Sequence, residues 1–198
     1  FFLMLSYLVT NTTLNIDRLV IRQVLGNEQV TWYYVTSLIG KTLVLLIAPI
    51  NTIVISYLTK RKERLTRLQY GKAALAGGIV SFVFFLACQV GTPLFVWLFY
   101  RNLYDSVKGI VTVVNLAQIL GLYSAFLFIL VLTFTDERWQ LGLQLAHFGI
   151  LLAVSIPAAK MCGLTGFAYA SLGANILRVA AVIILGLVKA QNGKGDET

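Results

Sequence analysis

Five polar side chains recur at helical spacing within the first apolar segment of the chain: Tyr7, Asn11, Asn15, Arg18 and Arg22. Residues three or four apart share one face of an α-helix, and the positions between these five are mostly Leu, Val, Ile and Thr. Amide and guanidinium groups are costly to place in lipid unless they are paired or hydrated. The stripe therefore predicts a helix face that contacts protein or water and could receive a polar or anionic molecule.

Two further charged residues accompany this stripe. Asp17 lies about 100° around the helix from Arg18, where it could partner a basic residue of a neighbouring helix. Lys41 is eight residues beyond Tyr33, roughly 12 Å along a helix, so its ammonium cannot easily reach the headgroups. Deep cations with few acids predict an anionic or phosphate-bearing cargo, because a guanidinium matches phosphate oxygens. The alternative is that Asp17 holds these cations in an internal ion pair. We predict a substrate pathway lined by Asn11, Asn15, Asp17, Arg18, Arg22 and Lys41.

Shorter polar stripes recur later in the chain. Gln144 and His147 are three residues apart, as are Asn175 and Arg178. These four are second candidates for lining the pathway or coupling transport to an ion. Their alternative roles are structural: hydrogen bonds between helices, packing of the imidazole of His147, and an Arg178 side chain that reaches the headgroups.

The composition indicates an all-α, polytopic membrane helix bundle. Of the 198 residues, 58% are hydrophobic and 12% are charged, whereas a soluble domain carries about 25% charged residues. The mean hydropathy is +0.81. The net charge of +8 would suggest nucleic acid for a soluble protein. In a membrane protein, basic residues are concentrated in the cytoplasmic connections and set the orientation of the helices, which explains this net charge. The expected partner is therefore the lipid bilayer and not nucleic acid.

Six segments are apolar enough to cross a bilayer as helices of about 20 residues: 1–25, 33–58, 73–99, 109–134, 139–158 and 164–188. Six basic residues lie between Lys60 and Lys72, so the positive-inside rule makes this connection cytoplasmic. Alternation then puts both ends of the segment in the cytoplasm. Residues 189–198 are expected to form a flexible cytoplasmic tail. Because the chain begins inside an apolar run without Met, we expect it to be the C-terminal part of a longer protein.

Two stretches resemble a known transporter family. "NIDRLVIRQVLGNEQVTWYYVTSLIGKTLVLLIAPI" resembles the start of the second half of polysaccharide flippases of the O-antigen and capsule type. The features in common are Asp17-Arg18, Leu25-Gly26, Tyr33 and Pro49. "RWQLGLQLAHFGILLAVSIPAAKMCGLTGFAYASLGANILR" is similar to the final helix pair of that family, through the motif from Gly163 to Gly166 and the small residues that follow it.

The resemblance implies the multidrug/oligosaccharidyl-lipid/polysaccharide exporter fold, in which two six-helix lobes enclose a central cavity. Residues 1–198 would form the second lobe, and an N-terminal six-helix lobe would be its partner. The implied function is to flip a polyprenyl-pyrophosphate-linked oligosaccharide across the bacterial cytoplasmic (inner) membrane for cell-surface polysaccharide biosynthesis. Polysaccharide polymerase and glycosyltransferases are candidate partners.

Three alternatives remain. The lipid II flippase branch carries a similar cargo, and multidrug antiporters share the fold but use cation-binding acids, of which only Asp17 lies deep here. A membrane enzyme of glycan assembly would need paired acids or a His with an acid. Asp136-Glu137 is the only adjacent acid pair, in a predicted turn. We therefore predict a non-enzyme with no catalytic residue, metal or cofactor.

Overall fold

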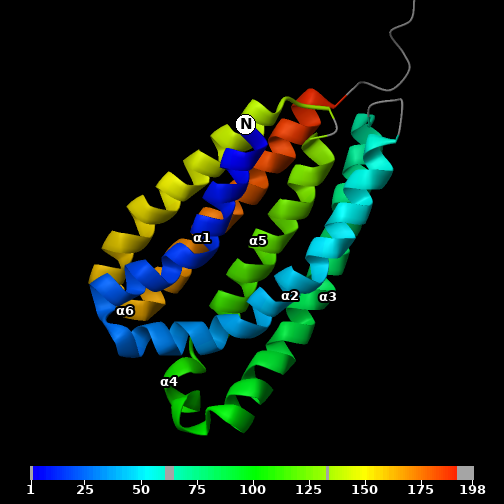
Figure 1. The fold of residues 1–198 in the computed structure, drawn as a ribbon. Coiled ribbons are helices and arrows are strands. Elements are labelled where there is room, and N and C mark those ends of the chain that lie inside the picture. Colours follow the sequence, from blue (N-terminus) through cyan, green and yellow to red (C-terminus); the bar gives the residue numbers. More distant parts are fainter. Residues whose placement is uncertain (1, 61–64, 133, 191–198) are drawn as a thin grey trace, which may run out of the picture.

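The computed structural model is all-α, which confirms the predicted fold class (Figure 1). It describes residues 2–60, 65–132 and 134–190, except for the side chains of 2, 3, 7, 14, 44–50, 57, 59 and 137. The elements are α1 (Phe2–Leu25), α2 (Asn27–Thr59), α3 (Arg67–Phe99), the 3₁₀ turn η1 (Arg101–Leu103), α4 (Tyr104–Val107), α5 (Val111–Leu132) and α6 (Glu137–Lys189).

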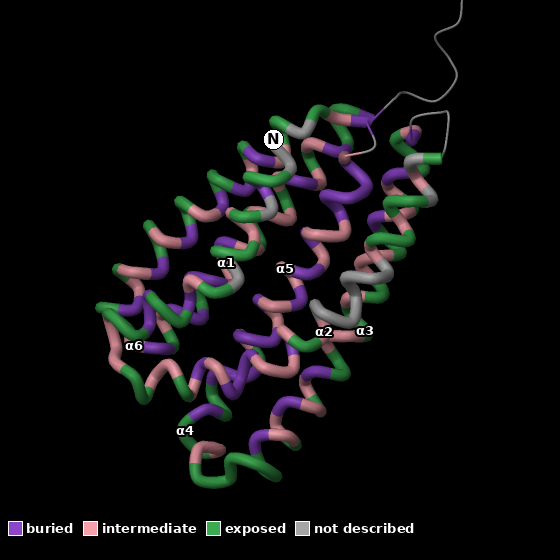
Figure 2. The backbone as a smooth tube through the Cα atoms, in the orientation of Figure 1, coloured by how far each residue is buried: buried purple, intermediate pink, exposed green. Residues whose placement is uncertain are grey.

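Helix α5 lies at the centre of the bundle. It contacts α2, α3 and α6, while α1 packs against α6 and α2 (Figure 1). Its sequence contains no charged residue, and most of its second half is buried, from Leu127 to Val131 (Figure 2). A helix without charged residues and with a largely apolar surface suits a position surrounded by other helices.

Helix α6 reverses direction at Gly163. A straight α-helix of 53 residues would be roughly 80 Å long, far more than the thickness of a bilayer. Gly163 has φ 63° and ψ −147°, a backbone conformation open to glycine, and the two arms on either side of it run back along each other (Figure 1). Near the other end of this hairpin, Lys189 Nζ lies 5.3 Å from the ring centroid of Trp139.

Several predicted connections are shorter than expected because helices extend into them. Gly26 alone, with φ 96°, separates α1 from α2, and α3 begins at Arg67 behind an N-cap in which Thr66 and Gln69 bond reciprocally. The expected loop after residue 158 is helical up to Gly163. Lys189, predicted to begin the tail, is the last residue of α6, and residues 191–198 lie outside the described part. Polar side chains do not stop a helix when caps and packing favour it.

Within the described residues, three helices are long and apolar enough to cross a membrane: α3, α5, and α6 from Arg138 onward. The chain is therefore a candidate multi-pass membrane protein. Helix α1 is not among the three, since Asn and Thr residues and the charges from Asp17 to Arg22 lower its hydropathy. Much of α3 is exposed, including Phe82, Val83 and Val90 (Figure 2), as expected of a surface that contacts lipid.

The contact between α3 and α6 depends on a glycine. Tyr70 is fully buried, and its hydroxyl donates to the carbonyl oxygen of Val182 at 3.2 Å. A β-carbon at Gly186 would overlap the ring of Tyr70. The hydrogen bond and the surrounding core prevent this ring from moving aside.

We predict that Gly186→Ala lowers the free energy of unfolding by about 1–3 kcal/mol through overpacking. Gly173→Ala is the matched control on the same arm of α6, where a β-carbon would meet no atom within 4 Å. Unfolding in detergent micelles by titration with a denaturing detergent measures both. Equal stability of the two variants would contradict the close packing at Tyr70.

Candidate polar pocket between the helices

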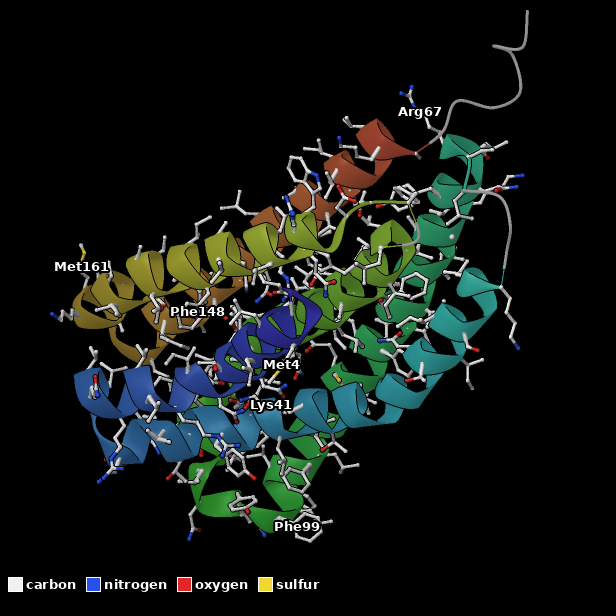
Figure 3. All side chains as sticks on the ribbon, turned by 45° about the horizontal axis from the view of Figure 1, so that its top comes forward. Met4, Lys41, Arg67, Phe99, Phe148 and Met161 are labelled. Carbon is white, nitrogen blue, oxygen red and sulfur yellow. The ribbon has the colours of Figure 1, made fainter. Side chains whose placement is uncertain are left out.

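Among the described residues, the closest charge pair joins α1 to α2. Lys41 Nζ lies 2.6 Å from Asp17 Oδ2, and the two side chains are 18% and 10% exposed. The other carboxylate oxygen, Oδ1, accepts a hydrogen bond from the backbone N–H of Arg18 at 2.8 Å. This confirms the expectation that Asp17 partners a basic residue of a neighbouring helix. Figure 3 labels Lys41 where α2 passes beside α1.

This ion pair borders a cavity of about 150 Å³ enclosed by α1, α2, α5 and both arms of α6. A cavity needs only about 10–15 Å³ of such volume to hold one water molecule, so several waters fit. Its lining includes eleven polar or charged side chains: Thr10, Thr13, Asp17, Tyr33, Lys41, Asn51, Gln118, His147, Ser171, Asn175 and Arg178. We call this cavity the polar pocket.

Tyr33 of α2 lies beside the polar pocket, where it approaches side chains of α5 and α6. Its side chain is 2% exposed, and its hydroxyl lies near the polar side chains of Ser171 on α6 and Gln118 on α5, which line the same pocket. Its ring meets Phe167 edge to face, with centroids 5.2 Å apart. A buried Tyr requires such partners for its hydroxyl. The sequence identified Tyr33 only through the family pattern, and nothing in its spacing predicts these contacts.

Two basic side chains of α6 face the polar pocket from its two arms. His147 is 5% exposed, and its Nδ1 atom is buried without a hydrogen-bond partner. The Arg178 guanidinium carbon lies 5.4 Å from the ring centroid of Phe128. The Nε atom of Arg178 is buried and also lacks a hydrogen-bond partner. Buried polar atoms are rarely left unpaired, so these two indicate that the pocket holds something polar.

The predicted α1 stripe lies on a different face from the polar pocket. Asn11, Asn15, Arg18 and Arg22 are all exposed and do not line the pocket. Arg18 stacks over Tyr34, with its guanidinium carbon 4.4 Å from the ring centroid. The structure therefore separates Arg18 from Lys41, which sequence reasoning had placed on one pathway. For Lys41, the alternative of an internal ion pair with Asp17 is the one observed.

Of the second candidates, His147, Asn175 and Arg178 meet in the polar pocket and Gln144 does not. Asn175 donates from Nδ2 to the Ser171 carbonyl oxygen at 3.0 Å within its own helix. Gln144 is 3% exposed, and its Oε1 has no hydrogen-bond partner. The polar pocket is thus lined by residues that are far apart in the sequence. Gln144 does not line it and is instead buried between packed helices.

A second polar cluster joins α3 to α5 away from the pocket. The Asn115 side chain accepts from Thr92 Oγ1 at 3.1 Å and donates to the Cys88 carbonyl oxygen and to Gln89 Oε1, both at 3.1 Å. Asn115 and Thr92 are fully buried. Side-chain amides commonly join membrane helices in this way.

An exposed ion pair provides a contrast to the one between α1 and α2. In the connection before α5, Lys108 Nζ lies 2.8 Å from Asp105 Oδ1, with side chains that are 60% and 87% exposed. The hydrogen bond to Asp105, followed by its charge, raises the pKa of Lys108. Water screens such a pair, so it contributes little to stability.

Comparisons with protein-family models, with curated proteins and with solved structures gave no match to this chain.

We predict that Lys41→Met strongly destabilises the bundle, because it leaves the Asp17 carboxylate buried and unpaired. Removing one partner of a buried pair costs about 3–5 kcal/mol. Adding Asp17→Asn should restore most of this loss, since it removes the stranded charge. The denaturation midpoint in detergent micelles measures both variants. Lys108→Met, at the exposed pair, should leave that midpoint unchanged, and a similar loss there or no rescue by Asp17→Asn would refute the pairing.

Proposed function

We propose that this chain is one six-span lobe of a membrane transporter that flips a polyprenyl-pyrophosphate-linked oligosaccharide across the cytoplasmic membrane. The main support for this proposal is the position of the polar stripe on α1. Asn11, Asn15, Arg18 and Arg22 are exposed on the outside of the bundle, although the helix belongs to a candidate membrane protein. Charged and amide groups at membrane depth face protein or water, so this face calls for a partner surface and an aqueous path.

A second lobe facing α1 would supply that surface. The sugar would then travel between the lobes, and the polyprenyl tail would stay in the bilayer. Transporters with two related lobes move cargo by rocking one lobe against the other around a central site. The internal ion pair and the tyrosine-centred contacts described above favour a lobe that moves as one body.

The arginines of the stripe suit the pyrophosphate of such a cargo. Arg18 is held against the ring of Tyr34, which limits the orientations of its planar guanidinium. Bidentate hydrogen bonds from a guanidinium match the oxygens of a phosphate group. Lys41 has a different role in this proposal, because its ammonium is bound to Asp17. It supports the helix that carries the stripe.

The same observations bear on the alternatives. Lipid II has the same pyrophosphate chemistry, so a lipid II flippase remains a second candidate. A cation-coupled drug antiporter is less favoured, since the only deep acid among the described residues, Asp17, is already neutralised by Lys41.

The proposed topology predicts that single cysteines at Lys60 and at Asp105 react with a membrane-impermeant thiol reagent from opposite sides. Both positions are exposed in the structure. Cys162 is exposed as well, so it is first replaced by Ser. Labelling in intact cells and in inverted vesicles is the measurement. Reaction of both cysteines from the same side would exclude the six-span topology.

We further predict that Arg18→Ala in the full-length protein strongly reduces surface glycan without reducing protein abundance, because Asp17 keeps Lys41 as its partner. Arg18→Lys should restore only part of the export, since the ammonium keeps the charge but lacks the bidentate fork. Surface glycan is measured by lectin or antibody binding and abundance by immunoblotting.

Arg101→Ala is the matched control for this experiment. Arg101 is exposed and lies over Trp97, with 5.5 Å between its guanidinium carbon and the ring centroid, but it is outside the stripe. Its replacement should leave export unchanged. Normal export by Arg18→Ala would refute the role of the stripe, and equal losses in both variants would point to a general effect of removing a stacked arginine.

A further inference from the structure

The polar pocket contains more positive than negative charge. Its ionisable lining consists of Asp17, Lys41, His147 and Arg178, together with the hydroxyl of Tyr33. Asp17 and Lys41 neutralise each other at 2.6 Å. A second positive charge beside Arg178 would be unfavourable in this buried space, so the imidazole of His147 is taken as neutral. The charge that remains is that of the Arg178 guanidinium.

Arg178 finds no acidic partner within the described part of the chain. The described ion pairs are Lys41–Asp17 and Lys108–Asp105, and the recorded contact of the Arg178 guanidinium is with the apolar ring of Phe128. The Nε–H group is buried without an acceptor. Arg178 lies eleven residues before Lys189, roughly 16 Å along the helix. An arginine this deep in an apolar bundle requires a counter-charge.

We infer that the polar pocket binds one small monovalent inorganic anion, of which chloride is the simplest example, against the guanidinium of Arg178. One negative charge balances the charge of the lining. The proposed anion site lies inside the lobe, whereas the α1 stripe lies on its outer surface. The anion site therefore does not depend on which cargo the transporter carries.

The cavity suits a small ion better than a large one. A volume of about 150 Å³ accommodates a monatomic anion together with a few waters. The Arg178 Nε–H supplies a charged donor, and a water can donate one hydrogen to the anion and the other to Nδ1 of His147. Three buried side-chain atoms of the described pocket lining lack partners: Arg178 Nε, His147 Nδ1 and Asn51 Oδ1. The anion accepts from Arg178 Nε–H, and waters beside it can donate to the other two atoms. Water alone would satisfy the hydrogen bonds but would leave the positive charge uncompensated.

The test compares the stability of the full-length protein in nanodiscs of zwitterionic lipid with potassium chloride, potassium gluconate or potassium sulfate at equal ionic strength. Binding to the folded state stabilises by mass action, so chloride at about ten times its dissociation constant should lower the unfolding equilibrium constant about tenfold relative to gluconate. Sulfate should resemble gluconate, whereas a general salting-out effect would make sulfate the more stabilising salt.

Arg178→Gln should abolish the chloride effect and should be more stable than the unmodified protein in gluconate, because it removes an uncompensated charge. Arg101→Gln is the matched control, since Arg101 also stacks on an aromatic ring but is exposed. It should keep the full chloride effect. If Arg178→Gln does not fold, Arg178→Lys should fold and show a weaker chloride effect, because the charge remains.

Three results would overturn the site: no difference between chloride and gluconate in the unmodified protein, stabilisation by sulfate at least equal to that by chloride, or a full chloride effect in Arg178→Gln. Line broadening of the chloride NMR signal by the unmodified protein, and its loss in Arg178→Gln, provides a direct measure of binding. Unchanged broadening in that variant would likewise place the anion elsewhere.

Discussion

The ion pair between Asp17 and Lys41 is the constraint on which the arrangement of the helices depends. A carboxylate and an ammonium placed separately among apolar side chains would each lose hydration without compensation. Their 2.6 Å contact requires one turn of α1 to lie beside one turn of α2. Because Gly26 alone separates the two helices, the charge pair and the tight turn together define this helical hairpin.

The rest of the pocket wall is built against that hairpin. Tyr33, on the same helix as Lys41, packs edge to face against Phe167 of α6 and shares the pocket lining with Gln118 of α5. These contacts fix the position of α2 relative to α5 and α6. The reversal at Gly163 brings the two arms of α6 together, and His147 and Arg178 thereby line the same cavity. Polar contacts of this kind specify one arrangement among many that apolar packing alone would allow.

Helix α1 consequently has two polar faces with different environments. Asp17 points into the bundle, while Arg18, the next residue, is exposed and stacks over Tyr34. Neighbouring residues on a helix point about 100° apart. The carboxylate of Asp17 therefore lies inside the bundle and the guanidinium of Arg18 lies outside it. In the proposed transporter, the inner face holds the lobe together and the outer face meets cargo. A counter-anion beside Arg178 would complete the charge balance of the interior.

Composition and helical periodicity predict the all-α class, a candidate multi-pass membrane chain and the stripe on α1, because both are local properties of the sequence. The sequence also indicated that Asp17 would find a basic partner, but it could not say which one. The helix ends were misjudged at Gly26 and Gly163, since a single glycine with positive φ reverses the chain where a longer loop was expected. Long-range packing brings Lys41 to Asp17, leaves Arg18 exposed, and places His147 and Arg178 in the lining of the same cavity. The first pair is 24 positions apart and the second is 31, and the packing of α5 and the reversal of α6, not local spacing, bring these residues together.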